Sequence, residues 1–185
     1  GSVEGKSRTQ YFNQFALSTR GKLSKTDEET YLEEMENTHG EMEISSYALQ
    51  NEKELSKPLI ETCEFANEGQ CEIMGDKIYV KPMLFLAETQ NPFKMEKREY
   101  PVDFIFPRQK KCMIGLTIPE GYKIESLPES SVVQLPEKLG TFSYQIVAQG
   151  SQVNVNVSMQ LASAIFPANY YDILKEYYKK WLKKR

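Results

Sequence analysis

The amino-acid sequence predicts a mainly β, α+β fold: an antiparallel β-sandwich with a short acidic N-terminal helix and an amphipathic C-terminal helix. Three observations predict it. Apolar and polar residues alternate without interruption over residues 153–160, which indicates a strand with one dry and one wet face. Further short alternating segments, separated by turn residues, precede it at a spacing typical of sandwiches. After Pro167, apolar residues recur at helical spacing.

Length and composition allow such a fold. The chain has 185 residues, 40% hydrophobic and 26% charged, which suffices for a sizeable core and argues against disorder. We expect residues 1–43 to form a strand and helix lead-in packed on the main domain, and residues 44–185 to form the sandwich with its C-terminal helix. The Gly1-Ser2 start is typical of a cloning remnant, so we expect a fragment of a longer protein.

The lead-in contains one helix signal. Residues 1–22 are polar with scattered aromatic rings and predict a strand or a short helix. The run Thr26-Asp27-Glu28-Glu29 then matches a capping box, in which the Thr26 side chain caps the helix and Glu29 reaches back. Tyr31, Leu32 and Met35 supply its apolar stripe, and Gly40 is a typical end.

The remaining elements follow in order. Gly75-Asp76 between two short apolar runs predicts a hairpin, and the apolar run Pro82–Ala87 predicts a buried strand. Further strands are predicted where apolar residues alternate, over residues 112–118, 141–146 and 153–160, with a turn at Pro119-Glu120-Gly121-Tyr122.

The segment Asn91–Phe104 is bounded by prolines and rich in charge. It predicts a polar crossover that leads into a half-buried strand, with Tyr100, Val102 and Phe104 in the core. The final helix presents a broad aromatic face, which we expect to dock on the sheet. That face comprises Tyr170, Ile173, Leu174, Tyr177, Tyr178, Trp181 and Leu182.

Cysteine usage is sparse. Cys63 and Cys71 flank the turn-like Asn67-Glu68-Gly69, and a hairpin there could bring them face to face. Two free thiols are favoured, and a bridge between them stays open. Cys112 starts a strand pattern and is interpreted as a core residue.

No pattern identifies a catalytic, cofactor-binding or metal-binding residue. His39, the single histidine, lies at a predicted helix end, and we do not expect it to act as the base that deprotonates any of the three cysteine thiols. Zinc-ligand spacings and glycine-rich phosphate loops do not occur, and Asp27, Glu28 and Glu29 are interpreted as a solvated first turn rather than a metal site. We therefore expect no enzyme activity and no cofactor, and the ligand-binding residues stay unknown.

Aromatic residues on a wet strand face could instead stack on sugars. Tyr100, Tyr122, Tyr144 and Phe142 are the candidates by residue type, and alternation places most of them in the core. The net charge of −3 argues against a nucleic-acid partner. No apolar run approaches the roughly 20 residues that span a bilayer, so we expect no transmembrane segment.

Several blocks together resemble one family. They are Lys81–Phe85, Asn91–Lys94, Arg98–Phe104, Ile118–Pro128, Leu135-Pro136 with Gly140–Phe142, and Tyr170-Tyr171 with Leu174–Tyr178. The resemblance is to the uncharacterised C-terminal domain that follows a transglutaminase-like domain in large envelope proteins of Gram-negative bacteria. It covers most of the chain, more firmly from about residue 44.

The resemblance implies a partner and a location. The partner is an upstream transglutaminase-like domain of the same chain, which would carry its own Cys-His-Asp set, and the location is the periplasm or cell envelope. The function it implies is that of a non-catalytic accessory domain that supports or positions the upstream domain. The alternative is a carbohydrate- or protein-binding module at the cell surface.

Overall fold

The computed structural model describes residues 1–40 and 42–182, and the chain divides into two compact units, Gly1–Lys81 and Pro82–Arg185. We expected a division after residue 43. It falls later because the first strand pairs over its whole length with a strand beyond that point, from Ser2 opposite Glu68 to Tyr11 opposite Leu59. Residues 1–43 therefore belong to the same sheet as residues 44–68.

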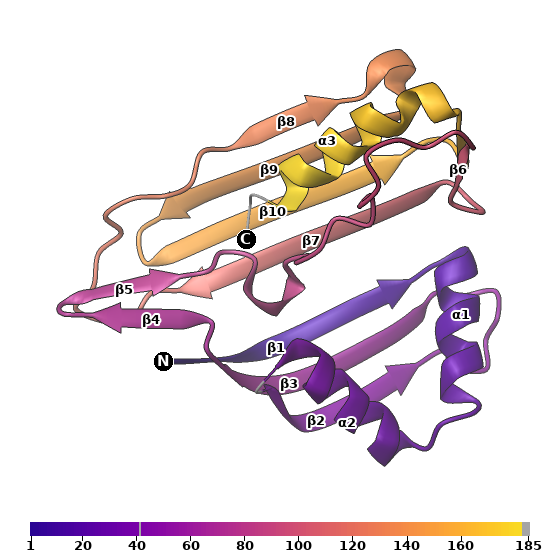
Figure 1. The fold of residues 1–185 in the computed structure, drawn as a ribbon. Helices are drawn as coiled ribbons and strands as arrows, with labels where there is room; N and C mark the ends of the chain where they lie inside the picture. Colours follow the sequence, from indigo (N-terminus) through magenta and orange to yellow (C-terminus); the bar gives the residue numbers. More distant parts are fainter. Residues whose placement is uncertain (41, 183–185) are drawn as a thin grey trace. The chain divides into compact units, whose positions relative to one another are not determined.

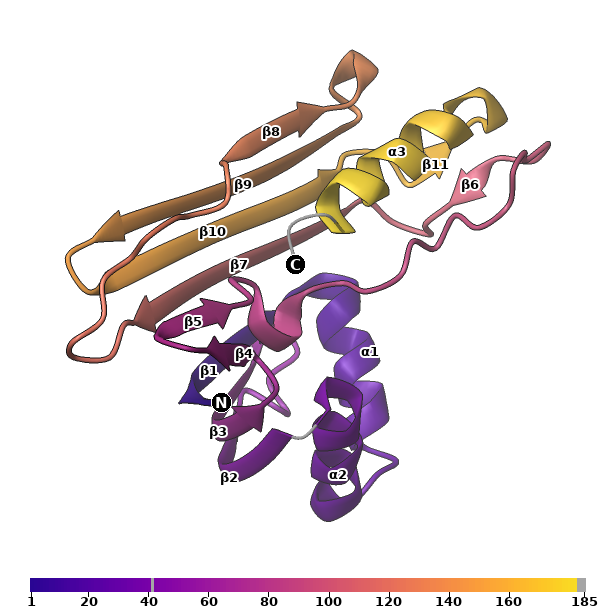
Figure 2. The same cartoon turned by 60° about the vertical axis from the view of Figure 1, so that its left-hand side comes forward.

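The first unit is a three-stranded antiparallel sheet covered on one side by two helices (Figure 2). Its elements are β1 (Ser2–Tyr11), α1 (Asn13–Leu23), α2 (Glu28–His39), β2 (Met42–Gln50), β3 (Leu59–Glu68) and the hairpin β4 (Cys71–Met74) with β5 (Lys77–Val80). The strand order β1-β3-β2 puts β3 in the centre. The predicted Gly75-Asp76 hairpin is confirmed.

The start of α2 corrects one prediction. Asp27, not Thr26, is the cap: its carboxylate accepts hydrogen bonds from the backbone N–H of Thr30 at 2.9 Å and from the Thr30 hydroxyl at 2.9 Å. Asp is as good a cap as Thr, and the paired Thr30 hydroxyl favours it here. These bonds lower the pKa of Asp27. Gly40 ends the helix with a φ of 57°, as predicted.

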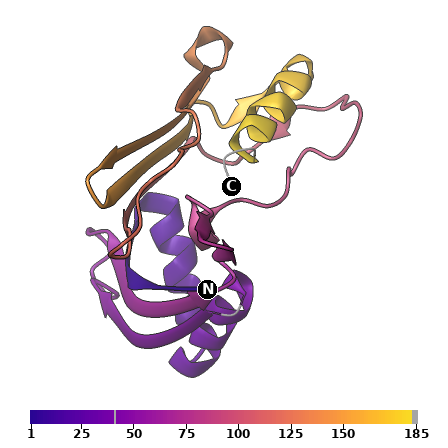
Figure 3. The ribbon, with the colours of Figure 1, turned by 90° about the vertical axis from the view of Figure 1, so that its left-hand side faces the viewer.

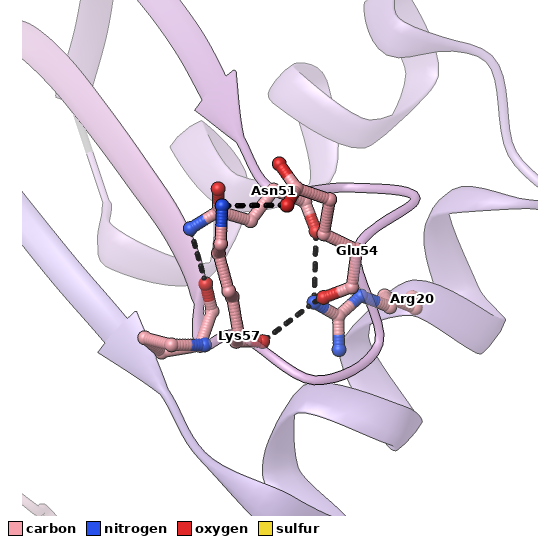
Figure 4. Close-up of polar contacts among 5 residues, drawn as sticks. Arg20, Asn51, Glu54 and Lys57 are labelled. Carbon is pink, nitrogen blue, oxygen red and sulfur yellow. Dashed lines mark hydrogen bonds and ion pairs between the residues drawn. The ribbon is translucent and has the colours of Figure 1, made fainter.

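One arginine ties α1 to the loop between β2 and β3. The Arg20 guanidinium donates to the backbone carbonyls of Glu52 (2.9 Å), Asn51 (2.8 Å), Glu54 (3.1 Å) and Lys57 (3.0 Å). Asn51 has a φ of 61°, and its side-chain amide donates to the Pro58 carbonyl at 2.9 Å. Figure 4 shows Arg20 with its bonds to Glu54 and Lys57. The fork of guanidinium donors therefore satisfies carbonyls that the loop turns inward.

The second unit is a four-stranded antiparallel sheet with the order β7-β10-β9-β8. Its elements are β6 (Val102–Asp103), β7 (Arg108–Thr117), β8 (Ser131–Gln134), β9 (Gly140–Gln149), β10 (Gln152–Leu161), β11 (Ile165–Phe166) and α3 (Tyr171–Leu182). Short 3₁₀ turns lie at Leu84–Leu86, Pro136–Lys138 and Ala168–Tyr170. The predicted strands over 112–118, 141–146 and 153–160 are confirmed.

Helix α3 lies across one face of this sheet (Figures 1 and 3). Most of its predicted apolar face shares a core with inward residues of β9 and β10 such as Phe142 and Val155, both fully buried. Ile173 was predicted on this face but is 38% exposed. The buried helix residues are Tyr171, Leu174, Tyr177, Tyr178 and Trp181. The Tyr177 hydroxyl donates to the Thr141 carbonyl at 2.9 Å, which satisfies the polar end of a buried ring. Docking of the final helix on the sheet is confirmed.

The segment from Asn91 to Phe104 runs beside α3 and pairs only briefly. Val102 is buried as predicted and Phe104 is half-buried, but Tyr100 is 76% exposed, so its predicted core position is wrong. Only Val102 and Asp103 pair, with Phe166 and Ile165 of β11 (Figure 2). Tyr100 precedes this short pairing, so strand alternation does not extend to it.

The apolar run after Pro82 is also not the predicted strand. Met83 and Leu84 are buried, but the chain forms a 3₁₀ turn over Leu84–Leu86. Apolar runs of this length do not distinguish a strand from a buried turn. Apart from these local corrections, the predicted mainly β, sandwich-like α+β class is confirmed, with an antiparallel sheet layered against helices in each unit.

The packing of α3 predicts a contrast between two neighbouring residues. Leu174 is fully buried, whereas Ile173 is 38% exposed. Leu174→Ala should lower the free energy of unfolding by about 2–5 kcal/mol because it leaves a cavity against the sheet. Ile173→Ala is the matched control and should cost less than about 1 kcal/mol. Urea unfolding followed by circular dichroism measures both, and equal effects would contradict this packing.

Candidate functional site

The most unusual polar group of the first unit is Glu61, a carboxylate on the central strand that is only 5% exposed. Its Oε1 accepts hydrogen bonds from the hydroxyls of Tyr31 (2.6 Å) and Tyr47 (2.7 Å). Tyr31 comes from α2. Tyr47 lies on β2 opposite Cys63, which places it diagonally beside Glu61 on the same sheet face. Tyr11 of β1 lies opposite Leu59, the other diagonal position.

These tyrosines make the buried carboxylate tolerable. An unpaired buried charge is costly, and hydroxyl donors offset that cost. Burial, together with the hydrogen bond to Glu61 and its negative charge, raises the pKa of Tyr11, Tyr31 and Tyr47. All three hydroxyls therefore stay protonated as donors far above neutral pH. We name Glu61, Tyr11, Tyr31 and Tyr47 the tyrosine cluster.

The tyrosine cluster joins elements from across the unit: α2, both outer strands and the central strand. Its groups donate to and accept from one another, which is what a structural network requires. Sequence reasoning missed it, since Glu61 follows Ile60 in a strand without a helical or catalytic pattern. The only sequence signal for the tyrosine cluster is that Glu61, an acidic residue, occupies an inward position of its strand.

Cys63, Cys71 and Cys112 are free thiols. A hairpin that would bring Cys63 and Cys71 face to face does not form, because β3 pairs with β1 and β2 while β4 pairs with β5. Burial raises the pKa of Cys63 and of Cys112, which favours the thiol over the nucleophilic thiolate.

The remaining candidate residues lie at the two ends of α2. His39 ends α2, where its backbone carbonyl lies 3.3 Å from the side-chain amide of Asn67. Asp27 caps that helix, and Glu28 and Glu29 lie in its first turn. Among residues 1–40 and 42–182, no group of three or more His, Cys, Asp and Glu residues could hold a metal ion. Nor does any helix in this described part have the length and apolarity to cross a membrane.

The face of the second unit's sheet opposite α3 is the best candidate for a binding surface, and we name it the outer face. Strand register places its side chains in rows, with Met113, Asn156 and Gln145 opposite one another on β7, β10 and β9. The outer face consists of Gln109, Lys111, Met113, Gly115 and Thr117 of β7; Gln152, Asn154, Asn156, Ser158 and Gln160 of β10; Thr141, Ser143, Gln145, Val147 and Gln149 of β9; and Val132 and Gln134 of β8.

The outer face is nearly uncharged. Lys111 is its one charged residue, although 26% of the whole chain is charged. The rest are amides, hydroxyls, one glycine and three apolar side chains, of which Met113 is 86% exposed and Val147 is 61% exposed. Cross-strand bonds order the amides, as between Gln152 Nε2 and Thr117 Oγ1 at 2.9 Å. Depletion of charge is the compositional mark of surfaces that become buried in complexes.

Part of the outer face was visible in the sequence. The wet side of the strand over 153–160 was recognised from its alternation, but joining it to the wet sides of β7 and β9 requires the register of three strands. Of the aromatic candidates for sugar stacking, Phe142 and Tyr144 are fully buried, as expected. Tyr100 and Tyr122 are exposed.

Most of the chain's match to a protein family lies in the second unit. Residues 76–185 match the family described as a Domain of Unknown Function with solved-structure structure, DUF3858. The chain belongs to this family. The matched range starts in the turn between β4 and β5 and includes the outer face and α3. No curated protein and no solved structure matches the chain. Membership of DUF3858 assigns the chain to a family but not to a function, so a function has to be inferred from features such as the outer face.

The tyrosine cluster predicts a pH dependence. Since the pKa of Tyr11, Tyr31 and Tyr47 is raised in the folded chain, the neutral hydroxyls stabilise it fully below about pH 10, the pKa of tyrosine in an unfolded chain. That contribution is lost as the pH rises further. The free energy of unfolding should therefore fall with increasing pH above about 10, as urea unfolding at a series of pH values would show.

The variant Tyr47→Phe separates this cluster from other alkaline effects. It should cost about 1–3 kcal/mol at neutral pH, because Glu61 loses one of its donors. It should also reduce the slope of stability against pH in the alkaline range. Tyr100→Phe, at an exposed ring, is the control and should change neither. An unchanged slope in Tyr47→Phe would show that the cluster does not govern alkaline stability.

Proposed function

We propose that this chain is a non-catalytic accessory module of a longer protein, and that it supports or positions an upstream transglutaminase-like domain by docking through the outer face. The setting we propose is the periplasm or cell envelope. The observation that carries the proposal is the outer face itself: an exposed, ordered, nearly uncharged sheet surface in the unit that matches the family. The upstream partner comes from the sequence resemblance.

The composition of the outer face suits a protein partner. Burying amides and hydroxyls opposite matching groups costs far less than burying charges, and exposed Met113, Val132 and Val147 add apolar contact. The surface is also a regular sheet, whose side chains stand in fixed rows, so little ordering remains to be done on binding. Its counterpart on the partner should likewise be poor in charge.

The groups with chemical reactivity support a non-catalytic role. Glu61 is committed to tyrosine hydroxyls, and burial keeps Cys63 and Cys112 as thiols. The hydrogen bonds of Glu61 connect α2 and β2 to β3, and catalysis in the longer protein would belong to the upstream domain.

The proposal can be tested by introducing negative charges into the outer face. Val147→Glu combined with Met113→Glu should weaken the association of this chain with the separately produced upstream domain at least tenfold, because two carboxylates would have to lose water on docking. Isothermal titration calorimetry measures the association.

Ile73→Glu is the matched control, since Ile73 is an apolar strand residue with 61% exposure, the same as Val147. It should bind like the unaltered chain. Equal affinity of the double variant would reject the outer face as the docking surface. If removal of residues 82–185 from the longer protein left its folding, location and activity unchanged, the accessory role itself would be rejected.

A second function, binding of a neutral glycan, is favoured by the exposed rings of Tyr100 and Tyr122. Exposed rings can stack on sugar faces, and amides such as those of the outer face can donate to and accept from sugar hydroxyls. Tyr100→Ala and Tyr122→Ala should then each reduce retention on insoluble neutral polysaccharides. Lack of retention of the unaltered chain on a panel of such polysaccharides would dismiss this alternative.

A further inference from the structure

A hollow of about 600 Å³ opens between α3 and the segment that leads to β6. One side is formed by Gln90, Asn91, Phe93 and Lys94, and the other by Lys175 and Lys179 of α3. It lies within the second unit, apart from the outer face. Its volume is comparable to that of small-molecule sites, about 300–1,000 Å³, but the hollow is shallow and open to solvent on most sides.

The walls of the hollow are held in place by specific bonds. The side-chain Oδ1 of Asn91 accepts from the backbone N–H of Phe93 at 2.9 Å, and the side-chain Nδ2 of Asn91 donates to the backbone carbonyl of Lys175 at 2.9 Å. The hydroxyl of Tyr171 and the ammonium of Lys175 both donate to the Met95 carbonyl, each at 2.9 Å. The segment is therefore fastened to α3 on both sides of Phe93.

An aromatic wall adds to this rigidity. The ring of Phe93 packs edge-on against Tyr178, with centroids 5.1 Å apart, and against Tyr171 at 5.6 Å. Phe93 is buried, so it cannot swing into the hollow without breaking these contacts. The hollow is thus present before any ligand arrives.

The charge of the hollow has one sign. Lys94, Lys175 and Lys179 line it, and no carboxylate is among its lining residues. Each ammonium has three N–H donors. Each lysine uses one donor within the chain. Lys94 donates to Gln90 Oε1 (3.3 Å), Lys175 to the Met95 carbonyl (2.9 Å) and Lys179 to Glu176 Oε1 (3.1 Å). Donor capacity therefore remains for further acceptors.

The pair between Lys179 and Glu176 does not cancel this charge. Both side chains are more than half exposed, at 55% and 60%. Such surface pairs contribute little, and an anion that contacts several ammoniums at once can compete with them. Lys94 and Lys175 have neutral oxygens as their partners, and within residues 1–40 and 42–182 neither forms an ion pair.

We propose that this hollow binds an oxyanion, a phosphate or carboxylate group carried by a polar molecule. The ammoniums would contact the anionic group, the amides of Gln90 and Asn91 supply neutral polar edges, and Phe93 offers an apolar wall to the rest of the ligand. This site is independent of docking through the outer face, and either one can fail without the other.

Nuclear magnetic resonance titration tests the proposal with three probes: inorganic phosphate, glucuronate and, as the uncharged control, glucose. At low ionic strength the backbone amide signals of residues 90–95 and 175–182 should shift with an apparent Kd on the order of millimolar for phosphate, glucuronate or both. Glucose should leave them unchanged. The two anions distinguish a phosphate group from a carboxylate group.

The combined variant Lys94→Gln and Lys179→Gln should raise that Kd at least about fivefold, because two ammoniums are removed from the hollow. It retains Lys175, whose bond to Met95 helps to fasten the segment. Lys123→Gln combined with Lys138→Gln removes the same charge elsewhere in the second unit and should leave the Kd unchanged.

Three results would overturn the proposal. They are no saturable shift with either anion up to about 20 mM, equal weakening in the two double variants, and shifts that spread over all exposed lysines instead of these two segments. Melting temperatures of both variants within about 2 °C of the unaltered chain would exclude misfolding as the cause.

Discussion

The docking of α3 on the four-stranded sheet is the contact on which the rest of the second unit depends. It buries five residues of the helix against β9 and β10, and so decides which face of the sheet is dry. The opposite face is left to water or to a partner. The same helix also supplies one wall of the lysine-lined hollow and the groups that fasten the Asn91–Phe104 segment. Outer face and hollow are therefore two consequences of one packing event.

The first unit obtains its order differently. Its sheet has three strands, and the contact between α2 and the sheet includes a polar network instead of apolar rings alone. The Glu61 carboxylate on the central strand β3 accepts hydrogen bonds from hydroxyls of α2 and β2, which fixes the helix position more narrowly than apolar contact would. The Arg20 contacts do the same for α1 and the loop after β2. Both the Glu61 and the Arg20 hydrogen bonds fix the orientation of a helix relative to its neighbours, and both require polar groups to lose water on folding.

Much of the fold was predictable because the signals were local. The alternation over 153–160, the turn at Pro119-Glu120-Gly121-Tyr122 and the aromatic stripe of the last helix each lie in one short stretch and agree with their neighbours. The errors came where two local choices are nearly equal in energy, as between Thr26 and Asp27 for the cap of α2. At Tyr100 the error arose because the strand pairing that follows is only two residues long.

The candidate sites were less predictable, since they arise from distant parts of the chain. The outer face needs the register of β7 against β10, and the tyrosine cluster brings residues 11, 31, 47 and 61 together from four elements. The hollow joins residues some eighty positions apart. No short stretch of the sequence contains the residues that form any one of these sites, so their proximity cannot be predicted from local patterns.

The full-length pairing of β1 with β3 has a consequence for where this chain can be cut. A fragment that began at residue 44, where the resemblance becomes firm, would lack β1 and leave one side of β3 with a row of unpaired backbone donors and acceptors. Glu61 would at the same time lose the neighbouring Tyr11 and the Tyr31 hydroxyl that donates to it. Such a fragment would offer a ten-residue template for edge-to-edge association between molecules, so the first strand acts as a built-in guard against self-assembly.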